Sequence, residues 1–182
     1  MRFVVRRPIF NYQEGVDGYE LNLEQPATGE PDPAETVATV AIALQRIPPQ
    51  TRVTVGCGHS LLNSSALRQL PPARVVLAID PHDEDPEERL RAARTLRESG
   101  YSLTLLDFAP ELGIEKYLGL VDAVGVKTDR DLAVVSAYLQ RIRGRTLRMI
   151  AREVATRADW AVAEKAGFRY FHGAYFLQPA QE

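Results

Sequence analysis

The sequence predicts a single α/β domain built mainly from parallel strand–helix units. Eight segments have the β-branched, aromatic or continuous apolar composition of strands. A tight turn separates the first two of these segments, which are therefore expected to be antiparallel. Helical patterns separate the later ones, which indicates parallel pairing. The segments alone leave two folds open, a closed TIM-like (β/α) barrel with a reversed first strand and an open doubly wound sheet.

The predicted strands follow from apolar composition and from the turn residues that bound them. The first segment is rich in Val, Arg and Phe, the second alternates apolar and polar residues, and residues 74–79 form a short apolar run. The turn between the first two strands spans Asn11 to Gly15. The expected strands are residues 2–10, 16–23, 52–57, 74–79, 102–108, 123–127, 147–154 and 169–176.

The predicted helices have recognisable starts and stops. Asp32 followed by Pro33 is a typical start, and Thr156 is a good N-cap. Glycines are expected to end two of the helices, at Gly100 and Gly167. The expected helices are residues 33–44, 60–70, 86–99, 110–118, 129–143 and 157–166.

Composition narrows the class of protein. The chain has 182 residues, and 22 basic against 24 acidic side chains give a net charge of −2. That balance argues against broad binding to nucleic acid or to anionic membranes. No apolar run has the length of a membrane span, and the first residues lack a signal peptide. The single cysteine, Cys57, excludes an internal disulfide and is expected to be a buried thiol in a cytoplasmic protein.

Several segments carry a resemblance to one family. Residues 6–11 and 16–21 read RRPIFN and VDGYEL, and residues 100–108 read GYSLTLLDF. Residues 150–156 read IAREVAT, and residues 167–179 read GFRYFHGAYFLQP. In this order they resemble EAL domains, in particular the variety often fused to a C-terminal HDOD domain. The resemblance covers residues 6 to 179, which is nearly the whole chain.

The resemblance implies a fold and a chemistry. EAL domains are TIM-like barrels with an antiparallel first strand, and active members hydrolyse cyclic di-GMP. They use two divalent cations, Mg²⁺ or Mn²⁺, which carboxylates hold at the C-terminal ends of the strands. The resemblance also implies that the natural chain continues past Glu182 into an HDOD domain.

Most of the family's functional positions carry other residues here. The glutamate of the signature corresponds to Glu20, and the second aspartate of the D-D-F element corresponds to Asp107. The glutamine near the end corresponds to His172, and an aspartate corresponds to Lys127. The remaining positions that have lost the family residue are Glu24, Gly56, Ala78, Leu106, Gly125, Arg152 and Ala155.

These replacements predict a domain without the phosphodiesterase reaction and without a cofactor. Gly, Ala and Leu side chains offer no ligand oxygen, and Lys127 would repel Mg²⁺. Glu153 is a poor substitute for a ligand because a one-residue shift in a strand turns the side chain to the other face. The candidate vestigial pocket is Glu20, Asp107, Lys127 and His172. The simpler reading is that Glu20 and Asp107 are bonded to an arginine or to Lys127.

Three functions remain as hypotheses. The first is an inactive EAL-like domain that regulates a protein partner or a fused domain in bacterial signal transduction, with homodimerisation left open. The second is a cyclic di-GMP receptor that does not hydrolyse its ligand, although Glu24 replaces an arginine that helps to hold the nucleotide in the family. The third is an unrelated barrel enzyme with a remodelled mouth. None of the three involves nucleic acid or a membrane as partner.

Overall fold

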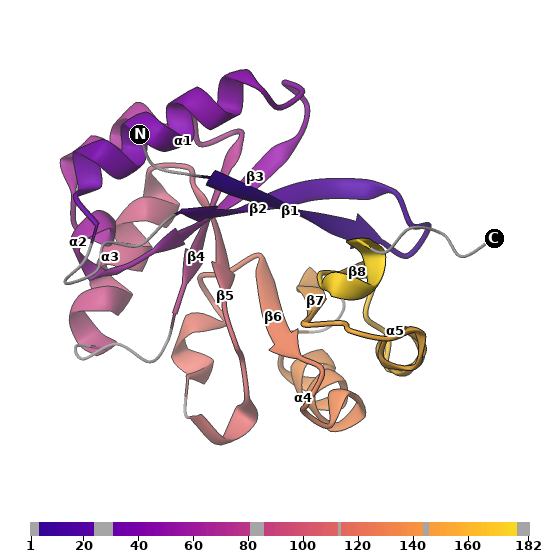
Figure 1. Cartoon of the computed structure of the whole chain (residues 1–182). Coiled ribbons are helices and arrows are strands. Elements are labelled where there is room, and N and C mark those ends of the chain that lie inside the picture. Colours follow the sequence, from indigo (N-terminus) through magenta and orange to yellow (C-terminus); the bar gives the residue numbers. More distant parts are fainter. Residues whose placement is uncertain (1–3, 24–30, 81–85, 113, 144–145, 178–182) are drawn as a thin grey trace.

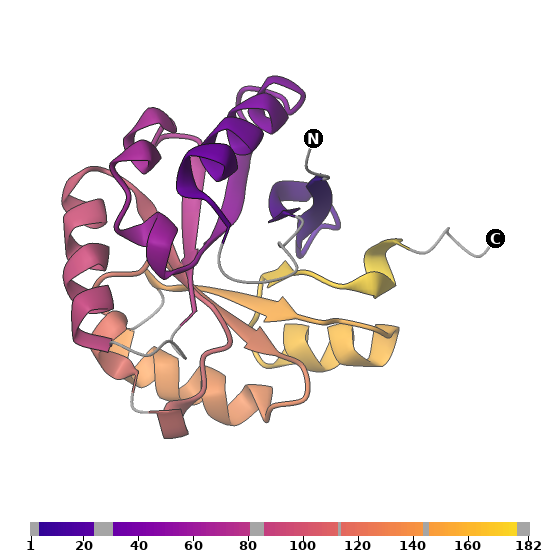
Figure 2. The ribbon, with the colours of Figure 1, turned by 60° about the vertical axis from the view of Figure 1, so that its left-hand side comes forward.

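The computed structural model describes residues 4–23, 31–80, 86–112, 114–143 and 146–177. Their eight strands form a closed barrel in the order β1 to β8 (Figure 1). The turned view in Figure 2 places the helices on the outside of the strands. The closed barrel confirms the TIM-like fold and excludes the open doubly wound sheet.

The elements have the following bounds. The strands are β1 (Val4–Asn11), β2 (Val16–Leu23), β3 (Arg52–Cys57), β4 (Val75–Ile79), β5 (Ser102–Leu105), β6 (Ala123–Lys127), β7 (Arg148–Arg152) and β8 (Tyr170–Phe171). The α-helices are α1 (Pro33–Gln45), α2 (His59–Leu62), α3 (Pro86–Glu98), α4 (Leu132–Arg143) and α5 (Arg157–Lys165). The 3₁₀ helices are η1 (Ser65–Gln69), η2 (Pro110–Leu112), η3 (Glu115–Tyr117) and η5 (Ala174–Leu177). None of these helices is long and apolar enough to cross a bilayer.

The first strand runs against the others, as the sequence predicts. β1 is antiparallel to β2 and to β8, and every other neighbouring pair is parallel. In the turn between β1 and β2, the Asn11 side-chain oxygen accepts hydrogen bonds from the N–H groups of Gln13 and Gly15, both at 3.0 Å. This turn reverses the chain within a few residues and so makes the first pair antiparallel.

The residues expected to begin and end the helices have those roles in the structure. The Asp32 side chain accepts a hydrogen bond from the Glu35 N–H at 2.8 Å, and Thr156 and Asp159 form a capping box on α5. Gly100 and Gly167 have φ angles of +90° and +95°, which glycine adopts without strain. These four signals are therefore confirmed.

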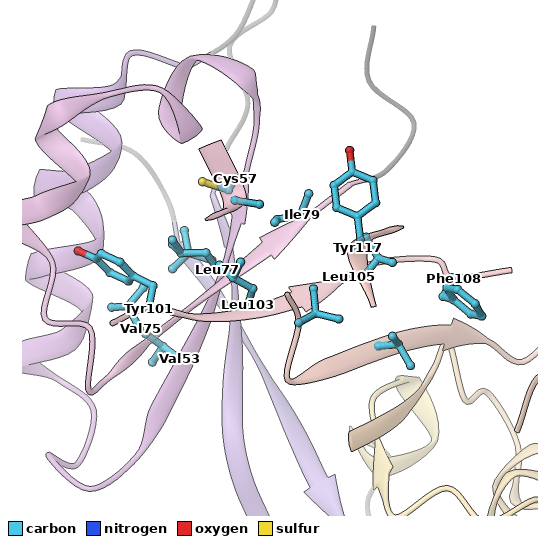
Figure 3. Close-up of a cluster of buried hydrophobic side chains, with 14 of the residues drawn as sticks. Val53, Cys57, Val75, Leu77, Ile79, Tyr101, Leu103, Leu105, Phe108 and Tyr117 are labelled. Carbon is cyan, nitrogen blue, oxygen red and sulfur yellow. The ribbon is translucent and has the colours of Figure 1, made fainter. Parts of the chain in front are cut away.

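The main core lies between the outer face of the strands and the helices. Figure 3 shows residues of β3, β4 and β5 that point into it, among them Val53, Leu77 and Leu103, each fully buried. The Tyr101 hydroxyl donates to the carbonyls of Leu67 and Leu70 at 2.8 and 2.7 Å, so its polar end is satisfied inside the core. Cys57 is 3% exposed, as predicted.

Two predicted elements are wrong in extent. The helix expected over residues 60–70 is split into α2 and η1, because Ser64 between them caps the second piece by accepting from the Ala66 N–H. The strand expected over residues 169–176 contains only Tyr170 and Phe171. A Cβ at Gly173 would lie 2.2 Å from the Val154 carbonyl oxygen, so the chain there presses against the end of β7 and then turns into η5.

Three further elements are shorter than expected. The strands predicted over residues 102–108 and 147–154 end at Leu105 and Arg152, and the helix predicted over residues 110–118 consists of η2 and η3. After both shortened strands a residue with positive φ turns the backbone, at 48° for Asp107 and 61° for Glu153. Both residues therefore leave the strand geometry at the C-terminal end of the barrel.

Candidate functional site

The C-terminal ends of the parallel strands bring the predicted positions together at the barrel mouth. The strand register places Gly56 beside Ala78 and Lys127 beside Arg152. Glu20 of β2 lies next to Thr54 of β3 in the same register. Residues from β2, β3, β4, β6 and β7 thus surround one end of the barrel, which is the end where α/β barrels place their active sites.

Arg152 is the centre of the contacts at the mouth. Its Nη2 donates a hydrogen bond to Glu20 Oε1 at 3.4 Å, across the barrel from β7 to β2. Its Nε lies 4.0 Å from Asp107 Oδ1. The side chains of Arg152 and Glu20 are 15% and 14% exposed, so water screens this pair only in part. Arg152 therefore joins the two carboxylates that the family resemblance retains.

Lys127 makes the second set of ion pairs. Its Nζ lies 3.3 Å from Asp107 Oδ2 and 3.5 Å from Glu153 Oε1. The carboxylate of Asp107, followed by that of Glu153, raises the pKa of Lys127 and keeps the ammonium charged. The pairing of Asp107 with Lys127 that the sequence suggested is present.

The expectation that Glu153 faces away from the mouth is wrong. That expectation assumed that β7 continues through residue 153, but the strand ends at Arg152. Glu153 has a φ of 61°, and this left-handed conformation turns its carboxylate toward Lys127. Asp107 also has a positive φ, so two non-glycine residues in an unfavourable backbone conformation flank the same ammonium group.

Two glycines at the mouth have different surroundings. A Cβ at Gly125 would lie 2.6 Å from Arg152 Cδ. The Arg152 side chain therefore occupies the space that a side chain at position 125 would need. A Cβ at Gly56 would have no heavy atom within 4 Å among the described residues. Gly125 is therefore coupled to Arg152, whereas Gly56 leaves open space.

His172 is buried beside this network. It is 5% exposed, and neither ring nitrogen has a hydrogen-bond partner within the described part of the chain. Burial lowers the pKa of His172, and the nearby charges of Arg152 and Arg7 add to that effect while Glu20 opposes it. A neutral imidazole is thus favoured near physiological pH.

The remaining predicted positions contribute less. Ala78 is buried at 2% exposure, and Leu106 is half-buried directly after β5. Ala155 is exposed, and its N–H donates to Asp159 Oδ2 at 3.1 Å as part of the start of α5. Glu24 lies outside the described residues. Within the described ranges, no three His, Cys, Asp or Glu side chains gather closely enough to hold a metal ion.

Sequence reasoning missed the role of Arg152. It counted this residue only as a lost ligand, although the side chain makes the central ion pair of the mouth. A usable signal was present, because a small residue at position 125 and a long basic residue at position 152 replace family residues together. If Gly125 and Arg152 are interpreted as a paired replacement, the sequence predicts that the arginine side chain lies over the glycine.

Known proteins resemble the chain in sequence and in fold. The uncharacterized protein YuxH of Bacillus subtilis is 27% identical over 97% of this chain and 47% of its own length. The cyclic di-GMP phosphodiesterase CdgJ of Vibrio cholerae is 26% identical over 97% of this chain and 44% of its own length. The chain therefore spans about half the length of these relatives. No protein-family model matches the sequence.

The crystal structure of an EAL domain protein from Listeria monocytogenes superimposes with a TM-score of 0.74 at 12% identity. The match covers 96% of this chain and 87% of that one. The chain thus has the EAL-domain fold, which confirms the fold that the sequence resemblance implied.

Proposed function

We propose that this chain is a catalytically inactive EAL-type domain of cyclic di-GMP signalling that acts by contacting a protein partner or a fused regulatory domain. The observation that carries the proposal is the pairing of Arg152 and Lys127 with Glu20 and Asp107. Two protein cations thus neutralise the carboxylates that active family members use for metal ions. The proposal includes a reducing cytoplasmic setting, in which the buried thiol of Cys57 stays unoxidised.

The residues at the mouth do not fit two divalent cations. A metal ion between Glu20 and Asp107 would lie against the guanidinium of Arg152 and the ammonium of Lys127, and like charges at such distances repel strongly. The neighbouring Gly56 and Ala78 supply no side-chain oxygen, which Mg²⁺ and Mn²⁺ require. The donor set therefore supports a mouth that has exchanged metal ions for basic side chains.

The unrelated-enzyme hypothesis receives less support. It needed Glu20, Asp107, Lys127 and His172 in one reactive pocket. Glu20, Asp107 and Lys127 do share one network through Arg152. Both carboxylates have basic partners, however, and the imidazole of His172 is buried beside the network without a hydrogen bond to a described residue. A carboxylate held in an ion pair is a weak general base at neutral pH. The fold similarity to EAL domains also favours an EAL-type domain over an unrelated enzyme.

Cyclic di-GMP turnover tests the main proposal. The protein is incubated with cyclic di-GMP and either Mn²⁺ or Mg²⁺, and the linear product is quantified. No metal-dependent turnover is expected. A double variant, Lys127→Asp with Arg152→Glu, restores two of the family's acids, and its melting temperature is expected to rise with added Mn²⁺ while that of the parent does not. Clean metal-dependent hydrolysis by the parent protein would contradict the proposal.

A non-hydrolysing receptor is the second candidate. It is favoured by polar groups without partners at the mouth, since Arg152 Nη1 and both His172 nitrogens have no hydrogen-bond partner among the described residues. Against it, the hollow beside Lys127 that Asp107, Phe108 and Arg130 also line has a volume of about 170 Å³. Pockets for drug-sized ligands usually have roughly 300–1,000 Å³.

Isothermal titration separates the two candidates. Cyclic di-GMP is titrated into the protein without divalent metal, with Arg152→Met as the matched variant. No heat at high micromolar nucleotide supports the interaction module. Saturable heat that Arg152→Met removes supports the receptor and contradicts the first proposal's account of the mouth.

A further inference from the structure

β1 takes part in two strand ladders of very different length. On one side its residues pair with β2 from Val4 to Phe10. On the other side only Phe10 and Asn11 pair with β8. For residues 4–9, no backbone hydrogen bond to any described residue other than those of β2 is found. Among the described residues, the outer edge of β1 is therefore unpaired toward the mouth, because Val4 lies opposite Leu23 at the C-terminal end of β2.

The short β8 explains this open edge. After Phe171 the chain stays bonded to the end of β7, because the His172 N–H donates to the Ala151 carbonyl at 2.8 Å. The Val154 N–H then donates to the His172 carbonyl at 3.1 Å, and the Tyr175 N–H donates to the Val154 carbonyl at 3.0 Å. The last segment thus follows β7, and no described strand lies beside the outer edge of the first half of β1.

The side chains along this edge are accessible. Val5 is 54% exposed, and Arg6 and Arg7 are exposed as well. An unpaired strand edge presents N–H and C=O groups that can pair with an added strand. Pro8 has no N–H, so an added strand would pair along residues 4–7 and end at the proline. The free edge is therefore short and has a defined end.

The positive charges of Arg6 and Arg7 indicate which kind of segment would pair with this edge. Neither Arg6 nor Arg7 lies within ion-pair distance of a described carboxylate. The Arg6 side chain donates a hydrogen bond to the Arg46 carbonyl at 3.2 Å. A second copy of the chain paired here in antiparallel fashion would bring arginines opposite arginines, which is unfavourable. An extended segment with acidic side chains would compensate both charges.

We propose that the edge of β1 formed by residues 4–7 binds an extended acidic segment of a protein partner, which is added to the barrel as a strand. Backbone hydrogen bonds supply the ladder, and carboxylates of the segment pair with Arg6 and Arg7. The inference rests on the proposed function and names the surface through which such a module contacts its partner.

Peptide binding at low ionic strength tests the edge. The probe is a fluorescein-labelled, acetylated peptide of sequence Glu-Val-Glu-Thr-Val-Glu, and binding is followed by fluorescence anisotropy. One control peptide carries N-methyl groups on alternate residues, which removes its ladder donors. The other control peptide has Lys in place of each Glu. Each control is expected to bind at least about tenfold more weakly.

Protein variants locate the site. Arg6→Glu with Arg7→Glu is expected to weaken binding of the acidic peptide by at least about tenfold. Arg91→Glu with Arg94→Glu on α3 makes the same change in net charge at exposed positions and is expected to leave binding unchanged. Amide hydrogen exchange of the complex is expected to slow within residues 4–7.

Three outcomes overturn the edge proposal. These are equal binding of the N-methylated peptide, equal weakening by the α3 variant, and no binding of any peptide, in which case the arginines and Pro8 only prevent strand pairing. The hydrolysis assay separates this failure from failure of the proposed function. Metal-dependent turnover contradicts the inactive domain, whereas absent turnover with absent peptide binding rejects only the edge.

Discussion

The two ends of the barrel are closed by the same kind of interaction, with different burial. At the base, Arg148 pairs with Asp17 and stacks 3.8 Å from the centre of the Tyr170 ring, and Arg97 pairs with Asp122. At the mouth, Arg152 pairs with Glu20. The base pairs have side chains that are about a third or more exposed, at 34% and 33% for Arg148 and Asp17. The mouth pair is less than half as exposed.

The different burial of these pairs is related to the different roles of the two ends of the barrel. In α/β barrels the base serves stability, and the mouth serves catalysis. Here the mouth holds the more buried ion pair, while strained backbone at Asp107 and Glu153 directs two carboxylates onto Lys127. Ion pairs neutralise charged side chains at both ends of the barrel. Because the pair at the mouth is less exposed to water, losing one of its partners is expected to cost more stability there.

The comparison predicts the largest effect for Arg152→Met. The variant leaves Glu20 and Asp107 without their shared guanidinium in a partly buried site, and we expect a loss of about 2 kcal/mol in the free energy of unfolding. Arg97→Met at the base breaks an exposed pair and is expected to cost at most about 1 kcal/mol. Urea denaturation measures both. Equal losses would remove the distinction between the two ends.

A second prediction concerns the glycine beneath the arginine. Gly125→Ala places a methyl group where Arg152 Cδ now lies, and we expect a cost of about 1–2 kcal/mol from overpacking and displacement of the ion pair. In an Arg152→Ala background the same change is expected to cost almost nothing. A double-mutant cycle by urea denaturation measures this coupling. Additive losses would mean that the two positions are independent.

A third prediction uses the lowered pKa of His172. The folded protein binds this proton less readily than the unfolded chain does. The contribution of His172 to the free energy of unfolding is therefore fully present above pH 6.5, the ordinary pKa of histidine, and is lost as the pH falls below that value. We expect His172 to contribute about 1 kcal/mol to the loss between about pH 7 and pH 5. His172→Gln is expected to flatten the stability profile in that window. An unchanged profile would show that His172 is not the group that titrates.

The smallest effect is expected for Lys127→Met. The Lys127 side chain is 36% exposed, so its pairs with Asp107 and Glu153 are screened, and we expect a loss of about 0.5–1 kcal/mol that shrinks at high salt. Thermal unfolding at low and high ionic strength measures this effect. A loss as large as that of Arg152→Met would place the main support of the mouth at Lys127.

Local signals predicted much of the fold. The bounds of β2, β3 and β6 match the predicted strands, and the caps at Asp32 and Thr156 lie where predicted. These features depend on neighbouring residues in the chain, so sequence patterns contain them. The length of β8 was not predictable in this way, because its end depends on contact between Gly173 and the Val154 backbone.

The candidate site was predictable in its members but not in its contacts. Glu20, Asp107, Lys127 and His172 all lie at the mouth, since strand periodicity and the family resemblance place them at strand ends. Their partners were hidden, because Arg152 crosses the barrel from β7 and reaches a residue 132 positions away in the chain. Glu153 was misjudged because one positive φ reversed the direction of its side chain.

Sequence patterns and the family resemblance together predict the order of strands and helices, the antiparallel start and most of the residues at the barrel mouth. Contacts between distant segments set which of these residues pair, where β8 stops, and that no described strand pairs with the outer edge of β1 at residues 4–7. Local structure is predictable because hydrophobic periodicity and helix capping depend on residues that are close together in the chain. Ion pairing and strand closure instead depend on distances between segments that come together only when the barrel closes.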